Sequence, residues 1–478
     1  MKLDMPPDAG GPRFGLSVSL RGDRLAIGHP YGGKSGYAYL WEREPFGWGL
    51  ADIVQASDGG DNDQFGYSVA TDGDTLLVGA IGHGPLSAKG KAYVFERGPS
   101  GWVETAQLVP SDPLAWVIGF SVDLQGDRAL VGAKSSGSLG DTLGRAFVFE
   151  RGPSGWVETA NLISSASAFD DGFGASVALD GDRVVIGAPF HDEGFAVVFE
   201  LQPGGGWVEQ AVLSPPDLAD SDWFGRGVAI QGDTVLVGAP AHDEVGINAG
   251  AAYVFDLILG QWVQTAKFVP GGPAGFPGAR NFGWSVAVDG QHAVVGFEFD
   301  DAIATSAGSV YLYHRDASGW SEGVKFFGSA LLPGDTFGYD VAIEGAEILV
   351  GAPNRSSAGS TSGKAYLFTR DSGASLLGDT ASVSVSRGGT QELQLGACPE
   401  HAGDTFQMGG TFSGTSPVFL DQGFLVPLNP DPYFFYTLTS PGIPLSPTTG
   451  TFDEWGRAYA SFTVPPDSQP FLVGLELH

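Results

Sequence analysis

The sequence predicts an all-β protein that consists of seven copies of one four-stranded unit, followed by a smaller β domain. Three observations predict this fold class. The 478 residues include 74 glycines and 31 prolines, which favour turns over helices. Short runs rich in Val, Tyr, Phe and Thr recur, and no long segment keeps the period of a helix. The same order of motifs also returns seven times before residue 372.

One complete unit is found in Phe65–Leu108. Turn residues separate its apolar runs, which predicts four antiparallel strands at Tyr67–Thr71, Thr75–Ala80, Lys91–Glu96 and Trp102–Leu108. The Asp72-Gly73 pair predicts a tight hairpin between the first two strands. A sheet of this size with two apolar faces is not stable alone, so it requires a copy of itself on either side.

The motifs of this unit recur at corresponding places along the chain. Each second strand ends in Gly-Ala or Gly-Ala-Pro, each third strand is aromatic, and fourth strands open on Gly-Trp. The piece ERGPSGWVETA occurs twice, at Glu96–Ala106 and Glu150–Ala160, which indicates internal duplication. Seven such units predict a seven-bladed β-propeller. The Phe-Gly pairs that open the units, with one Ile-Gly variant, begin at Phe14, Phe65, Ile118, Phe173, Phe224, Phe282 and Phe337.

A propeller must close its ring, and the last unit lacks a Gly-Trp strand. Lys2-Leu3 corresponds to Lys267-Phe268 at the end of a fourth strand, so the N-terminal residues are expected to complete the seventh blade. Ser372–Leu377 is the competing candidate. The predicted domains are a propeller at 1–372, a linker at 373–380 and a C-terminal β-sandwich at 381–478, where apolar and polar residues alternate.

The order of the motifs FG-x-SVA, LVGAP and G-x-AYVF, preceded by acidic segments such as SDGGDNDQFG, resembles the FG-GAP repeat. The resemblance covers residues 1–372 and is strongest to the bacterial variety, which is found in secreted and surface proteins and is related to the integrin α-subunit propeller. The C-terminal segment resembles small domains appended to secreted planctomycete-type proteins. These resemblances imply a secreted or cell-surface protein, although MKLDMPPDAGG lacks the apolar core of a signal peptide.

Charge and composition exclude several classes of partner. Lys and Arg number 24 and Asp and Glu number 55, which gives a net charge of −31. Such a surface repels nucleic acids and anionic lipids, whereas cationic partners, neutral glycans and divalent cations remain open. No apolar stretch is long enough for a membrane span. The single cysteine, Cys398, excludes a disulfide framework, and a monomer is expected.

Loop length distinguishes the two faces of the predicted propeller. The first-to-second and third-to-fourth turns are short and share one face. The other connections, such as Ile81–Gly90, are long and variable, and we call their side the long-loop face. Because function concentrates in loops on a rigid scaffold, this face is the expected binding surface for a protein or glycan. The candidate ligand-binding residues are Trp223, Asp222, Asp220, His191, Asp192, Glu193, His242, Asp243 and Glu244.

Among these residues, Trp223 is the best single candidate, because it lies in a fourth-to-first loop rather than at the start of a fourth strand. The His-Asp-Glu triplets occupy equivalent places in two adjacent blades, and they would form one rim. That rim suggests an alternative function, a metal-dependent hydrolase or lyase. His29 and His83 are expected in the same loop of the first two blades. A purely structural module of a secreted protein is a further alternative.

Neither a metal nor a catalytic residue is expected. Integrin-type repeats carry an Asp-x-Asp-x-Asp-Gly calcium loop between the first two strands, whereas this chain has only turns such as Asp72-Gly73-Asp74. Two carboxylates cannot supply the six to eight oxygens that calcium needs. No Gly-x-Ser-x-Gly elbow is present, and Cys398 lacks a neighbouring motif. The sequence therefore predicts a non-enzymatic protein without a cofactor, and calcium stays an alternative only through the acidic clusters of the long-loop face, such as Asp217, Asp220 and Asp222.

Overall fold

The computed structural model describes residues 2–4, 11–45, 47–83, 89–134, 143–190, 192–271, 280–321, 323–329, 331–354 and 363–370, together with short strand segments from 376 to 477. Contacts divide the chain into two units, Lys2–Leu367 and Phe368–His478 with Met1. Among the described residues there is no helix of the length and hydrophobicity that a membrane span requires.

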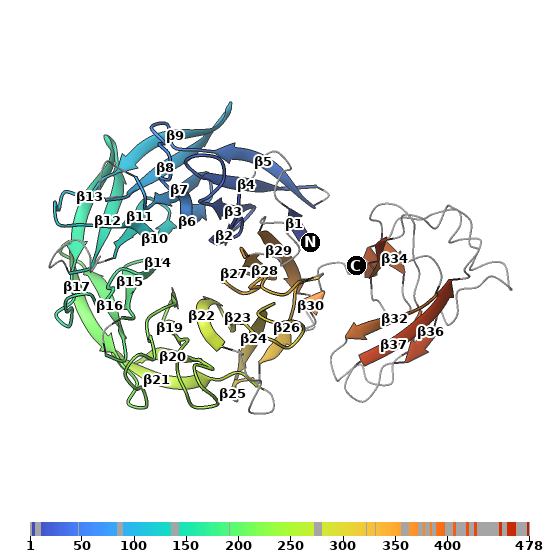
Figure 1. Ribbon diagram of the computed structural model, residues 1–478. Coiled ribbons are helices and arrows are strands. Elements are labelled where there is room, and N and C mark those ends of the chain that lie inside the picture. Colours follow the sequence, from blue (N-terminus) through green and yellow to red (C-terminus); the bar gives the residue numbers. More distant parts are fainter. Residues whose placement is uncertain are drawn as a thin grey trace. The chain divides into compact units, whose positions relative to one another are not determined.

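The first unit is a ring of antiparallel sheets arranged around a common axis, which confirms the predicted seven-bladed propeller (Figure 1). The strands of blades one to four are β2 (Val18–Arg21), β3 (Arg24–His29), β4 (Tyr37–Glu44), β5 (Gly47–Val54); β6 (Phe65–Asp72), β7 (Thr75–Ala80), β8 (Lys91–Gly98), β9 (Gly101–Leu108); β10 (Ile118–Gln125), β11 (Arg128–Ala133), β12 (Arg145–Gly152), β13 (Gly155–Leu162); and β14 (Ser176–Asp180), β15 (Arg183–Ala188), β16 (Phe195–Gln202), β17 (Gly206–Leu213).

Blades five to seven follow the same order from the axis outward. Their strands are β18 (Val228–Gln231), β19 (Thr234–Ala239), β20 (Ala251–Ile258), β21 (Gln261–Phe268); β22 (Arg280–Asp289), β23 (His292–Phe299), β24 (Ser309–Asp316), β25 (Gly319–Trp320), β26 (Val324–Phe326); and β27 (Asp340–Glu344), β28 (Glu347–Ala352), β29 (Lys364–Arg370), with β1 (Lys2–Asp4) and β30 (Leu376–Leu377).

Both candidates for the last strand pair with β29. Leu3 of β1 is opposite Ala365, and β30 pairs with Thr369 and Arg370 at the other end of the strand. The sixth blade divides its outer position in the same way, because β25 and β26 both pair with β24. The prediction that the N-terminal residues complete the seventh blade is thus confirmed, and the competing segment extends the same position.

The motif glycines allow neighbouring blades to touch through their backbones. Gly66 of the second Phe-Gly pair has a φ of +89°, and a Cβ there would lie 2.2 Å from the carbonyl oxygen of Tyr37 in the first blade. A Cβ on Gly28 would lie 2.1 Å from the carbonyl oxygen of Gly66. Phe65 next to this contact is fully buried. The Phe-Gly and Gly-Ala motifs therefore meet at each blade interface, where no side chain fits.

The hairpin motif also connects neighbouring blades. Gly73 has a φ of +57° as the first of two loop residues between Asp72 and Thr75, which fits a type II′ turn. The carboxylate of Asp72 accepts a hydrogen bond of 2.5 Å from the backbone nitrogen of Gly126 in the next blade. Asp74 pairs with Arg24 of the preceding blade at 3.1 Å. These carboxylates therefore connect each hairpin to the neighbouring blades and stabilise the ring.

The C-terminal unit is described only as short strand segments. β31 (Val383–Ser384) pairs with β38 (Glu476–Leu477), β32 (Gly389–Gly396) with β37 (Arg457–Val464), β33 (Thr405–Gln407) with β36 (Thr449–Thr451), and β34 (Pro417–Phe419) with β35 (Leu425–Pro427). All four pairs are antiparallel. Cys398 and the connections between these strands lie outside the described residues. The β-sandwich and the domain boundaries stay predictions.

Candidate functional site at the mouth of the central channel

The first strands of the seven blades line a channel along the axis, which encloses a volume of about 300 Å³. Side chains on these strands accept hydrogen bonds from the backbone of the next strand around the ring. Ser17 Oγ accepts from the nitrogen of Val69 at 3.1 Å, and Asp340 Oδ2 accepts from the nitrogen of Val18 at 2.7 Å. Burial raises the pKa of Asp340 to about 6, although the hydrogen bond from Val18 opposes the shift.

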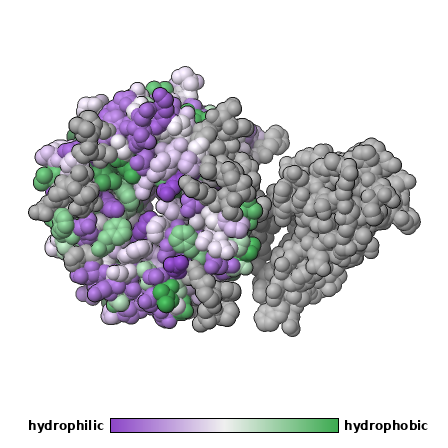
Figure 2. All heavy atoms as spheres, viewed as in Figure 1, coloured by the Kyte–Doolittle hydropathy of each residue, from purple (hydrophilic) through white to green (hydrophobic). Residues whose placement is uncertain are grey.

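The residue that follows each Phe-Gly pair lines the channel at the start of the first strand, where the fourth-to-first loop arrives from the previous blade. This end of the strand belongs to the long-loop face. We call these seven residues the mouth ring, and from blade one to blade seven they are Leu16, Tyr67, Phe120, Ala175, Arg226, Trp284 and Tyr339. Figure 2 views the propeller along the channel, and residues of high and low hydropathy surround its centre.

Aromatic side chains dominate the mouth ring. The rings of Tyr67 and Phe120 lie 5.1 Å apart between centroids, and those of Trp284 and Tyr339 lie 5.7 Å apart. All four side chains are half-buried, so each keeps part of its surface accessible. Such partly exposed aromatic side chains offer a large contact area at a small cost in conformational entropy. The ring therefore forms a rigid aromatic surface in the middle of the long-loop face.

Positive charges accompany these aromatic rings. The guanidinium of Arg226 lies 3.8 Å from the centroid of Trp284. The ammonium of Lys134 lies 4.8 Å from the centroid of Phe120 and 4.6 Å from that of Phe190. Burial lowers the pKa of Lys134 and the nearby charge of Arg226 lowers it further, whereas the charge of Asp170 opposes this shift. Cation–π contacts of this kind hold a charge in place without neutralising it.

One buried acid lies close to these charges. Glu298 of β23 is 2% exposed, and its Oε1 accepts a hydrogen bond of 2.8 Å from Asn281 Nδ2. Burial raises the pKa of Glu298 to about 7, although the hydrogen bond from Asn281 and the charge of Arg226 oppose this shift. Glu298 therefore carries only part of a negative charge at neutral pH and balances Arg226 incompletely.

The predicted contact residue Trp223 lies beside this mouth. It is half-buried in the loop before β18, with a φ of +60°, and its ring meets that of Phe190 edge to face at 6.4 Å. Phe190 is 40% exposed and also contacts Lys134. Asp220 in the same loop is exposed. Trp223 is therefore connected to the mouth ring through Phe190 and Lys134.

Most of the other predicted residues participate in loop structure. Asp222 is 3% exposed and accepts hydrogen bonds from the nitrogen of Ala219 at 2.9 Å and from His242 Nδ1 at 2.7 Å. Asp243 Oδ1 accepts from the nitrogen of Asn248 at 2.6 Å. These bonds fix the loops around blade five rather than leaving the groups available for a ligand.

The first His-Asp-Glu triplet is only partly described. His191 lies outside the described residues. The carbonyl oxygen of Asp192, which has a φ of +50°, accepts a hydrogen bond of 2.7 Å from the nitrogen of Ser221. Glu193 Oε1 accepts one of 3.3 Å from Ser214 Oγ. The expectation that His29 and His83 lie in the same loop of their blades is wrong. His29 is the fully buried last residue of β3, whereas His83 follows its strand β7 by three residues.

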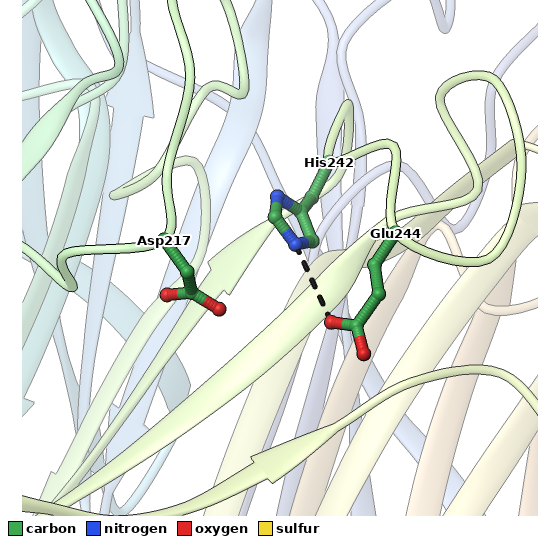
Figure 3. A group of neighbouring side chains, drawn as sticks. All are labelled: Asp217, His242 and Glu244. Atoms are coloured by element: carbon green, nitrogen blue, oxygen red, sulfur yellow. Dashed lines mark ion pairs between the residues drawn. The ribbon is translucent and has the colours of Figure 1, made fainter.

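The second triplet contributes to the cluster shown in Figure 3. Asp217, His242 and Glu244 offer ligand atoms that all lie within 4.8 Å of one another. Lys267 of β21 occupies the space between them. Its Nζ lies 2.6 Å from Asp217 Oδ2 and 2.9 Å from His242 Nε2, and it also pairs with Glu244. Because His242 Nδ1 donates to Asp222, its Nε2 lone pair accepts from the ammonium, and the cluster contains its own cation.

Lys267 was not predicted as a member of this cluster from the sequence. Burial alone would lower its pKa, but the hydrogen bonds to Asp217 and Glu244 raise it instead. A similar cluster occurs in blade two, where Lys91 pairs with Asp58 at 2.7 Å and His83 Nδ1 pairs with Asp63 at 2.7 Å. The signal in the sequence was a basic residue that recurs near the start of third strands or the end of fourth strands, as at Lys91, Arg145, Lys267, Lys325 and Lys364.

The fold and these contacts define a repeat protein of the β-propeller class. A family model for the FG-GAP repeat matches residues 48–95, 156–199, 207–255, 262–313 and 320–368, which make up just over half of the chain. The protein belongs to the FG-GAP repeat family. Each match runs from the tryptophan of a fourth strand to the end of the following third strand, so the sequence repeat is offset by one strand from the blade. No curated protein matches the chain.

Proposed function

We propose that this protein is a non-enzymatic recognition or adhesion protein that is secreted or displayed at a cell surface. It binds a protein or glycan ligand at the mouth of the channel on the long-loop face. The observation that carries the proposal is the ring of partly exposed aromatic side chains around Arg226, with Trp223 beside it. The FG-GAP propeller is consistent with such a role, and the ligand-binding groups lie on rigid strands rather than on loop tips alone.

The contacts of the His242 cluster support the non-enzymatic reading. A metal-dependent hydrolase requires open coordination positions, whereas the Lys267 ammonium contacts all three ligand groups. The equivalent lysine contact in blade two fits a role in the blade architecture. We therefore propose that the His-Asp-Glu residues hold the loops around the mouth and take no part in chemistry.

The test is binding of the full chain to an array of glycans and extracellular matrix proteins. We expect at least one ligand, with Trp284→Ala and Trp223→Ala each weakening it about tenfold or more, as for central aromatic contact residues. The matched control is Leu259→Ala, which removes a fully exposed apolar side chain from a short turn on the opposite face. Unchanged melting temperatures must show that the variants fold. A silent array, or equal binding by all variants, would favour the purely structural alternative.

A further inference from the structure

Three cations at the mouth lie against aromatic rings. Arg226 lies over Trp284 and Lys134 lies between Phe120 and Phe190, while the guanidinium of Arg13 lies 5.3 Å from the centroid of Tyr31. Within the described part of the chain, no carboxylate is at ion-pair distance from any of these three. A fixed, unpaired guanidinium over an aromatic ring is a preorganised site for a carboxylate.

The three cations lie on two opposite sides of the mouth. Leu16 and Ala175 are the small members of the mouth ring and face each other across it, in blades one and four. The charge of Arg13 acts on both Tyr67 and Tyr339, which flank Leu16.

At the other end, Lys134 contacts Phe120, which flanks Ala175, and Phe190 from blade four. Arg226 is the neighbour of Ala175 on the other side. The two small members of the mouth ring, Leu16 and Ala175, therefore have positive charge beside them on both sides of the mouth.

We infer that this mouth binds a linear acidic polysaccharide, in which carboxylates of successive uronic acids pair with Arg13, Arg226 and Lys134. The inference rests on the proposed function and names the ligand class of the same site. Sugar rings present apolar C–H faces, which suit the accessible aromatic surfaces of Tyr67, Phe120 and Trp284. A polymer with regularly spaced carboxylates can contact more than one cation at once. Each further contact is intramolecular, so it strengthens binding without the entropy cost of binding a second molecule.

The net charge of −31 opposes an anionic ligand at long range. At physiological ionic strength, however, screening limits such repulsion to about 8 Å. The acids that line the channel, Asp123 and Asp340, accept hydrogen bonds from the backbone nitrogens of Leu179 and Val18, and Glu298 is buried and bonded to Asn281. These acids are engaged in hydrogen bonds within the protein, so Arg13, Arg226 and Lys134 are the charged groups that a carboxylate can pair with, and the global charge slows association more than it weakens the bound state.

The experiment is titration calorimetry of the full chain with a galacturonic acid oligosaccharide in chelator at physiological salt. A neutral malto-oligosaccharide of the same length and an oligoglutamate peptide are the comparison ligands. We expect Arg226→Gln to weaken binding of the acidic oligosaccharide about tenfold or more, as for loss of a charged hydrogen bond. Arg183→Gln is the matched control, because Arg183 also lies over a tryptophan, Trp262, but at the opposite face.

Each outcome separates this inference from the proposed function. Selective binding of the acidic oligosaccharide that depends on Arg226 and not on Arg183 supports it. Equal binding of the neutral oligosaccharide, preference for oligoglutamate, or full affinity in Arg226→Gln overturns it. If the acidic oligosaccharide does not bind while an array ligand still requires Trp284, the proposed function stands and this inference fails. If neither assay finds a ligand, both fail.

Discussion

The buried histidine at the end of β3 should make the propeller sensitive to acid. His29 is fully buried, and its Nε2 donates a hydrogen bond of 3.2 Å to the carbonyl oxygen of Gly11. Its Nδ1 has no partner among the described residues. Burial lowers the pKa of His29 to about 4 from 6.5, although the backbone hydrogen bond opposes this shift. The folded protein therefore keeps this imidazole neutral at pH values where an unfolded chain would protonate it.

The sign and size of the effect follow from proton linkage. Above pH 6.5 the side chain is neutral in both states and adds no pH dependence. Between pH 6.5 and about 4, only the unfolded state binds the proton, so the free energy of unfolding falls by about 1.4 kcal/mol per pH unit. The total loss by pH 4 is about 3 kcal/mol, and it levels off below the folded pKa.

Another blade of the propeller suggests a substitution that removes only the titration of the His29 side chain. Phe297 occupies the position of His29 in blade six and packs edge to face on Phe282 at 5.8 Å, just as His29 packs on Phe14 at 6.0 Å. His29→Phe should therefore fit, at the cost of about 1 kcal/mol for the lost hydrogen bond. Buried acids such as Asp340 shift stability in the opposite direction, but they are common to both proteins.

The assay is urea unfolding of both proteins by tryptophan fluorescence from pH 7.5 to pH 4. We expect the parent to lose about 3 kcal/mol relative to His29→Phe across this range, with no relative change above pH 7. If His29→Phe prevents folding, His29→Ala is the second variant, because alanine occupies the corresponding position in blade two, at Ala80. Parallel stability curves, or an imidazole that titrates near pH 6.5 by NMR in the folded parent, would refute the reasoning.

Two further predictions concern the scaffold. Lys267→Met removes the cation between Asp217, His242 and Glu244. Zinc should therefore raise the melting temperature of the variant but not of the parent, as measured by scanning fluorimetry. A rise in the parent would contradict this account. Gly79→Ala places a Cβ 2.0 Å from the backbone oxygen of Gly119 and should cost about 3 kcal/mol or more in urea unfolding, whereas Gly204→Ala, with open space around it, should change little.

The sequence predicted the fold because each blade repeats the same local pattern. The strands of Phe65–Leu108 lie where alternation and turn residues placed them, with ends extended by one or two residues. The roles of individual motif residues were not predictable from one copy, since those roles lie between copies. Asp72 binds the next blade and Asp74 the preceding one, and neither contact can be inferred from a single hairpin.

The candidate site was predicted only in part, for a similar physical reason. Trp223 was placed on the long-loop face from its position in the repeat. The mouth ring was not predicted because the residue type at this position of the repeat differs from blade to blade, from leucine at Leu16 to arginine at Arg226. In a sequence, a variable residue inside a strand resembles ordinary packing. Asp222 was expected to face a ligand, yet its loop folds back and buries the carboxylate against His242. Loop conformation depends on such tertiary contacts, which periodicity does not report.

The distribution of ion pairs strengthens the case for the mouth. Arginines at the start of second strands pair with hairpin acids of the next blade, as Arg128 does with Asp182 at 3.2 Å and Arg183 with Asp233 at 2.7 Å. Acidic residues outnumber basic ones by more than two to one, so a cation without an acid does not reflect a shortage of acids. The collection of three such cations around one aromatic opening is therefore the arrangement that the inferred acidic ligand requires.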